Sequence, residues 1–130
     1  MAEKKKILII ENSPTQAAVI AGLLEELSYV PVVYTEVDKG VAQILAIENP
    51  FAVLLDVKLL DRNGNRVADG FKICREIKRK YKGMPVIVMS SEGNEQASAW
   101  AQMQGADDFL KKPFSSDDLE DILERIIYKS

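Results

Sequence analysis

Carboxylates, an amide, hydroxyls and ammonium groups stand where the apolar runs of this sequence stop. In chain order these residues are Glu11, Asn12, Asp56, Ser90, Ser91, Lys111 and Lys112. Carboxylate and amide oxygens suit a hard cation such as Mg²⁺, which is typically held by one or two carboxylates and keeps several waters. A carboxylate can also attack phosphorus and form an acyl phosphate. Because a cation, a hydroxyl and a lysine would neutralise phosphoryl oxygens, this set of residue types favours phosphoryl chemistry.

The composition excludes several other kinds of chemistry. The 130 residues include no histidine, so His-based general-base catalysis, His metal ligation and a phosphohistidine are excluded for this chain. The net charge of -3 argues against a uniformly basic nucleic-acid face. The lone Cys74 has no partner for an intramolecular disulfide, and no apolar run approaches the ~20 residues that span a bilayer. We therefore expect a cytoplasmic protein that contacts neither nucleic acid nor membrane.

Short apolar runs alternate with amphipathic segments along the chain. The expected strands are 7–10, 30–34, 52–56, 86–89 and 108–112, and the expected helices are 14–27, 37–48, 70–81, 94–104 and 116–128. Ser13 is a plausible N-cap before Pro14, and Gly105 is a good helix stop. In the fourth helix Ala97, Ala101 and Met103 are expected to face the core.

This alternation predicts one α/β domain in which a parallel sheet is covered by helices on both faces. The first, third and fourth runs are continuously apolar, as expected for central strands. In such sheets ligands bind outside the carboxyl ends of the strands, where the strand order reverses. The polar residues that end the runs should therefore meet in one small patch.

The segments ILIIENSPT, AVLLDV, PVIVMSS and GADDFLKKPF carry most of these residues. In this order and spacing they resemble the receiver domain of two-component response regulators, the CheY-like superfamily. The resemblance covers nearly the whole chain. It implies a (βα)5 doubly wound, flavodoxin-like fold with strand order 2-1-3-4-5, and transfer of a phosphoryl group from a histidine kinase to Asp56.

The resemblance also implies a metal site. Glu11 and Asn12 fall at the family's acidic pair, and the backbone carbonyl of Lys58 would be the remaining protein ligand of Mg²⁺ beside Asp56. The family normally has Asp where this chain has Asn12. Since an opposite-charge contact near a protein surface gains up to about 4 kcal/mol before desolvation is subtracted, we expect Mg²⁺ to bind tens-fold more weakly here.

Further positions match the switch elements of the family. The resemblance makes Ser90 the switch hydroxyl with Ser91 as its small neighbour, and Lys112 the lysine that contacts the phosphoryl group. Pro113 falls where the family usually has a cis peptide bond. Phe109 falls at the family's rotameric aromatic, although an aromatic at a strand end also commonly belongs to the core.

The segment after Asp56 is longer than the family pattern. Asp69-Gly70 comes 13 and 14 positions after the acceptor, so the loop carries extra residues, from Asp61 to Arg66, that are rich in turn formers. The insertion could be a lid, a partner-recognition element or a tolerated addition.

Lys58 and Glu92 fall at opposite sides of the family's pocket, where an ion pair would hinder the water that hydrolyses the acyl phosphate.

The leading interpretation is a stand-alone receiver with no output domain that signals by docking on another protein. A face containing Trp100, Phe109 and Lys111 would read out the switch, with the protein a monomer or a phosphorylation-dependent dimer. Apart from its own phosphorylation and dephosphorylation, no enzymatic activity is expected. The alternative is a pseudo-receiver that binds partners without phosphate because Asn12 replaces a metal-binding Asp.

Overall fold

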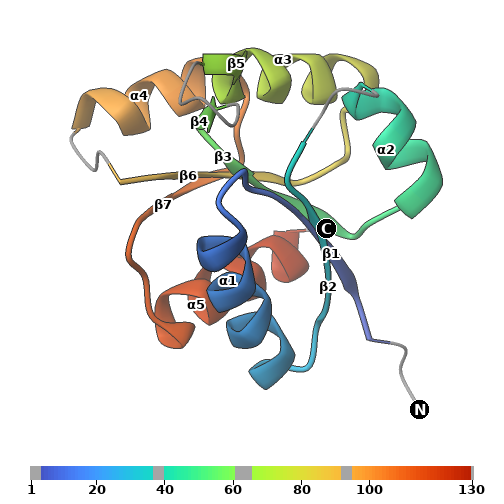
Figure 1. Ribbon diagram of the computed structural model, residues 1–130, viewed down its shortest axis with the longest axis vertical. Coiled ribbons are helices and arrows are strands. Elements are labelled where there is room, and N and C mark those ends of the chain that lie inside the picture. The colour runs from blue at the N-terminus through green and yellow to red at the C-terminus, as the bar shows by residue number, and fades with distance from the viewer. Residues whose placement is uncertain (1–3, 37–39, 61–65, 92–94, 130) are drawn as a thin grey trace.

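A five-stranded parallel sheet forms the centre of the molecule (Figure 1). The computed structural model of the chain describes residues 4–36, 40–60, 66–91 and 95–129. The strands are β1 (Lys6–Ile10), β2 (Val30–Tyr34), β3 (Ala52–Asp56), β6 (Val86–Ser90) and β7 (Asp108–Lys111). They lie in the order β2-β1-β3-β6-β7, so the predicted order 2-1-3-4-5 is confirmed.

Helices cover both faces of this sheet. They are α1 (Pro14–Glu26), α2 (Val41–Glu48), α3 (Gly70–Lys80), α4 (Glu95–Met103) and α5 (Ser116–Lys129). Figure 1 shows α1 and α5 on one side of the sheet and α2, α3 and α4 on the other. The expected starts at Val37 and Asn94 lie outside the described residues. Within the described ranges, none of the helices combines the length and apolar character that a membrane crossing requires.

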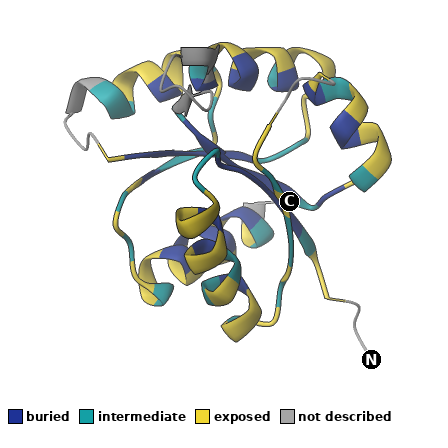
Figure 2. Ribbon diagram, viewed as in Figure 1, coloured by how far each residue is buried: buried dark blue, intermediate teal, exposed yellow. Residues whose placement is uncertain are grey.

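The sheet separates two hydrophobic cores. Because successive side chains of a strand point to opposite faces, Leu8 and Ile10 of β1 join the core under α2, α3 and α4. Ile7 and Ile9 join the core under α1 and α5. Every residue of β3 and β6 is buried, as predicted for central strands, and Figure 2 shows this buried band across the sheet.

Local signals fix the ends of several helices. Ser13 caps α1 by accepting the backbone N–H of Gln16 at 3.3 Å, as predicted. At α5 the cap is Ser115, whose hydroxyl accepts the Asp118 N–H at 3.1 Å while Asp118 accepts the Ser115 N–H at 3.0 Å. Gly105 has φ +89°, the left-handed conformation that ends helices and favours glycine.

The segment after Asp56 is not simply the loop that we expected. It contains two short antiparallel strands, β4 (Lys58–Leu60) and β5 (Arg66–Asp69), with an irregular register between Leu59 and Leu60. Residues 61–65 lie outside the described part. The Gly70 N–H donates to the Val57 carbonyl at 2.9 Å, which closes the base of this hairpin directly beside the end of β3.

The prediction for Met103 was wrong. Ala101 is buried, but the side chain of Met103 is 77% exposed. Residues four apart share a helix face, as Ala97 and Ala101 do, whereas a residue two positions further on points elsewhere. Met103, the last residue of α4, therefore lies off the buried face.

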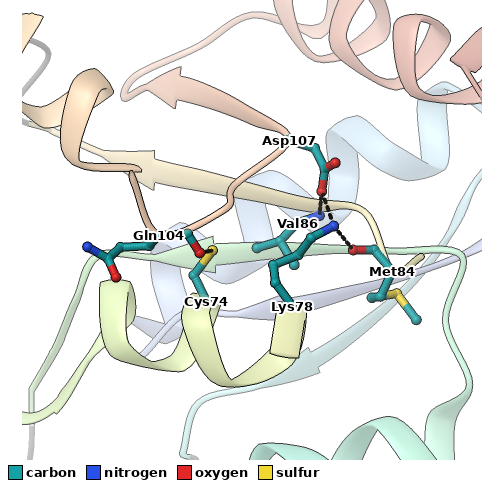
Figure 3. Close-up of polar contacts among 6 residues, drawn as sticks. All are labelled: Cys74, Lys78, Met84, Val86, Gln104 and Asp107. Carbon is teal, nitrogen blue, oxygen red and sulfur yellow. Dashed lines mark hydrogen bonds and ion pairs between the residues drawn. The ribbon is translucent and has the colours of Figure 1, made fainter. Parts of the chain in front are cut away.

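A polar network ties α3 to the amino ends of β6 and β7 (Figure 3). The Lys78 ammonium donates to the Met84 carbonyl and to Asp107, both at 2.9 Å, and the same Asp107 oxygen accepts the Val86 N–H at 2.8 Å. Cys74 donates to the Gln104 carbonyl at 3.7 Å. Burial raises the pKa of the Cys74 thiol to about 11, so it stays protonated and acts as a small core residue.

Candidate functional site

The strand register brings the polar strand ends together at one edge of the sheet. In the β1–β3 ladder Ile10 pairs with Leu55, so the following residues, Glu11 and Asp56, lie at the same level on adjacent central strands. On the far side of β3, Ser90 pairs with Lys111 in the β6–β7 ladder. The Lys112 N–H continues that ladder by donating to the Ser90 carbonyl at 2.8 Å.

Lys112 connects these strand ends through its side chain. Its ammonium lies 2.6 Å from Glu11 Oε1 and 3.4 Å from Asp56 Oδ1. It also donates to Gln16 Oε1 of α1 at 2.9 Å. Because the side chains of Glu11 and Asp56 are only 1% and 11% exposed, the lysine supplies a positive charge to two largely desolvated carboxyl groups.

Glu11 is the electrostatically unusual group of the site. Burial raises the pKa of Glu11 from its ordinary value of 4.5 to about 7, and the neighbouring Asp56 carboxyl adds to the rise, while Lys112 opposes it. At neutral pH the metal-free protein therefore holds this carboxyl part protonated and part ionised.

Glu11 should make folding stability depend on pH. Its pKa is higher in the folded than in the unfolded chain, so the folded state binds more protons between pH 4.5 and about 7. The free energy of unfolding should therefore fall as pH rises through this window, by on the order of 3 kcal/mol from this group. Urea unfolding of wild type and Glu11→Gln at pH 5 and pH 8 would measure it. Equal pH dependence in both proteins would contradict the expectation.

The donor set fits a hydrated Mg²⁺ ion. Glu11 Oε2 is buried, and no hydrogen-bond donor from the described residues reaches it. This orphaned oxygen is available to a cation, with Asp56 beside it and the half-buried Asn12 next along the chain. Two carboxylates and one amide are oxygen ligands of the kind that a hydrated Mg²⁺ ion takes.

The remaining predicted site residues occupy different environments. Ser90 is 4% exposed at the end of β6, whereas Ser91 is exposed. The Lys112–Pro113 peptide bond is cis, as the resemblance implied. Phe109 is half-buried and packs against the core under α2, α3 and α4. Its packing is compatible with both the core and the switch interpretation.

The predicted docking face is only partly assembled by described contacts. Trp100 is 52% exposed, and its ring and that of Phe71 in α3 form a T-shaped pair with centroids 6.0 Å apart and an angle of 61° between the ring planes. Lys111 is exposed at the end of β7. Glu92 lies outside the described residues and the Lys58 side chain is not described, so their predicted ion pair stays a prediction. The contact of the Lys58 backbone carbonyl with Mg²⁺ also stays a prediction.

Two residues near the site were missed by sequence reasoning. One is Gln16, whose contact with Lys112 joins positions 96 residues apart. The other is Gly70, whose backbone abuts Asp56 and Val57. The sequence signals that could have identified them were a polar side chain in the first turn of α1 and a glycine close after the inserted segment.

A groove of about 370 Å³ adjoins Lys112. It is lined by Thr15, Gln16, Val19, Ile20, Leu23, Ser91, Lys112, Pro113 and Phe114.

A doubly wound sheet with two carboxylates, an amide, a serine and a lysine at the carboxyl ends of its strands is the arrangement of a receiver domain. The family model described as "Response regulator receiver domain" matches residues 7–124. The chain therefore belongs to this family. Receiver domains accept phosphoryl groups from histidine kinases, generally with Mg²⁺, and act on downstream effectors.

Individual relatives agree with this assignment. The nitrogen assimilation regulatory protein NtrX of Azorhizobium caulinodans is 35% identical over 121 residues, which cover 93% of this chain and 26% of that protein. The transcriptional regulatory protein YxdJ of Bacillus subtilis is 33% identical over 86% of this chain and 45% of its own length. The chain thus spans less than half of these curated relatives.

A solved structure shows the same fold. The receiver domain of NtrX from Brucella abortus superposes with a TM-score of 0.82 at 28% identity, covering 95% of this chain and 99% of that one.

Proposed function

We propose that this domain takes a phosphoryl group from a histidine kinase onto Asp56 with the help of Mg²⁺, and that the phosphoryl group switches its contacts with a downstream protein. The observation that carries the proposal is the Lys112 ammonium, which lies 2.6 Å from Glu11 and 3.4 Å from Asp56 at the carboxyl edge of the sheet. A lysine in this place can contact a phosphoryl oxygen on Asp56 while it stays paired with Glu11.

Transfer of the phosphoryl group forms one bond to phosphorus and breaks another. An oxygen of the Asp56 carboxylate forms a bond to phosphorus while the phosphorus–nitrogen bond of the donor phosphohistidine breaks, and the released imidazole nitrogen takes a proton from solvent. Lys112 and the buried Ser90 hydroxyl donate to the phosphoryl oxygens. Glu11, Asn12 and Asp56 would hold Mg²⁺, which when bound neutralises negative charge on the transferring group.

The switch would pass from Ser90 toward the face that carries Trp100 and Lys111. Ser90 pairs with Lys111 in the ladder, and Phe109 lies two residues earlier on the same strand. Movement of the Ser90 hydroxyl toward a phosphoryl group would therefore shift the residues of β7 that pair with β6. A downstream protein that docks on α4, β7 and α5 would distinguish the two states.

The test is incubation with a small-molecule phosphodonor over a Mg²⁺ titration, followed by intact-protein mass measurement. We expect the mass of one phosphoryl group to be added to wild type and not to Asp56→Asn, which keeps the size of the side chain but removes the nucleophile. If wild type gains no mass even at high Mg²⁺, the proposal fails and the phosphate-independent pseudo-receiver becomes the better interpretation.

A further inference from the structure

Gln16 contacts the site although it lies outside the motifs that match the family. It lies in the first turn of α1 and its side-chain oxygen accepts a hydrogen bond from the Lys112 ammonium at 2.9 Å. Its backbone N–H donates to the Ser13 cap, so this end of the helix holds the residue in place. The side chain also lines the groove beside Lys112.

The Lys112 ammonium has three acceptors close to its three N–H groups. Glu11 at 2.6 Å and Gln16 at 2.9 Å are within ordinary hydrogen-bond distance, whereas Asp56 at 3.4 Å is longer. The ammonium is therefore drawn toward the Glu11 and Gln16 side. Movement of the ammonium toward a phosphoryl group on Asp56 would lengthen these two contacts, so each of them opposes that movement.

Gln16 is the partner that is easier to release. Glu11 is buried, so in its ionised form the loss of its contact with Lys112 would leave a desolvated carboxylate without that positive charge. Gln16 is neutral and exposed, so water can replace the lysine as its hydrogen-bond donor.

We propose that Gln16 is a positioning residue that tethers the Lys112 ammonium in the resting domain and gives it up to the phosphoryl group on Asp56. The release rests on the proposed function, whereas the tether is a property of the resting protein. Gln16 thereby influences how readily Lys112 contacts the phosphoryl group on Asp56, without itself touching the reacting atoms.

Two substitutions at this position should act in opposite directions. Gln16→Leu removes the acceptor at similar size, so Lys112 becomes free to turn toward Asp56. Gln16→Glu keeps the shape but binds the ammonium more tightly and repels a phosphoryl anion. The first turn of α1 contains no acidic residue, so a Glu there should also stabilise the helix. Loss of phosphoryl binding in Gln16→Glu would thus not come from unfolding.

The experiment measures binding of beryllofluoride, an acyl-phosphate mimic, in the presence of Mg²⁺. We expect Gln16→Leu to bind a few-fold more tightly and Gln16→Glu about tenfold more weakly than wild type. Ala18→Glu places the same charge on an exposed position of α1 outside the groove and should change binding little. Effects of both Gln16 substitutions in the same direction, or no effect of either, would overturn the proposal.

A second measurement tests the tether without any phosphoryl mimic. The ¹⁵N-detected ammonium signal of Lys112, assigned by its loss in Lys112→Gln, should be protected from exchange in wild type and broadened in Gln16→Leu. An unchanged signal would overturn the tether. If wild type binds no beryllofluoride at all, the proposed function fails and the release with it, whereas the ammonium signal still decides whether Gln16 holds Lys112.

Discussion

Replacing Gly70 by alanine should destabilise the domain and disturb the phosphoryl site in one step. A Cβ atom at this position would overlap the Asp56 carbonyl oxygen and lie 2.7 Å from Val57 Cα and 2.9 Å from the Val57 carbonyl oxygen. These neighbours are backbone atoms at the end of β3, so no side chain can rotate away to make room. We expect the free energy of unfolding to fall by about 1–3 kcal/mol or more, as in overpacked cores.

The backbone displacement caused by the added Cβ should also move Asp56, because the atoms that must make room are its own carbonyl group and the backbone of Val57. Urea unfolding would measure the stability, and the mass gain after incubation with a phosphodonor would measure the site. Gly22→Ala is the matched control. Gly22 lies inside α1 with nothing within 4 Å of an added Cβ, so this change should stabilise by about 0.4–1 kcal/mol. A Gly70→Ala protein as stable as wild type would contradict the close approach at the end of β3.

The sheet was predictable from local patterns because each of its strands carries its own signal. The runs that became β1, β3 and β6 are apolar throughout, and a strand buried on both faces demands this. Caps and stops such as Ser13 and Gly105 were readable for the same reason, since each acts within one turn of the chain. The family resemblance then implied the strand order, and the structure confirms it.

The missed features depend on contacts that no local pattern carries. The meeting of Glu11 and Lys112 in one patch was expected from the strand ends, but the contact of Lys112 with Gln16, 96 residues away in α1, was not. In the sequence Gly70 resembles an ordinary turn glycine. Its close approach to the Asp56 backbone arises only because the β4–β5 hairpin brings the chain back to the end of β3. The hairpin had a signal in the sequence, because strand-forming residues flank the turn-rich DRNGN. We interpreted the segment as a loop because it is longer than the family pattern.

Asn12→Asp should strengthen Mg²⁺ binding tens-fold while it weakens the metal-free domain. The substitution puts a third carboxylate next to Glu11 and Asp56, where burial and then the neighbouring Asp56 already raise the pKa of Glu11. Without metal the extra charge adds repulsion at a desolvated edge of the sheet. With metal the same charge attracts the cation, and an attraction of up to about 4 kcal/mol before desolvation leaves room for a tens-fold gain.

Calorimetric Mg²⁺ titration and urea unfolding with and without Mg²⁺ would separate the two effects. Gln102→Glu, at an exposed position of α4, adds the same charge away from the site and should change neither measurement appreciably. If Asn12→Asp binds Mg²⁺ no better than wild type, Asn12 is not a ligand, and Glu11, Asp56 and the predicted Lys58 backbone carbonyl must hold the cation without it. If wild type already binds Mg²⁺ tightly, the amide oxygen and the orphaned Glu11 Oε2 suffice, and replacing Asp by Asn12 has not weakened this receiver.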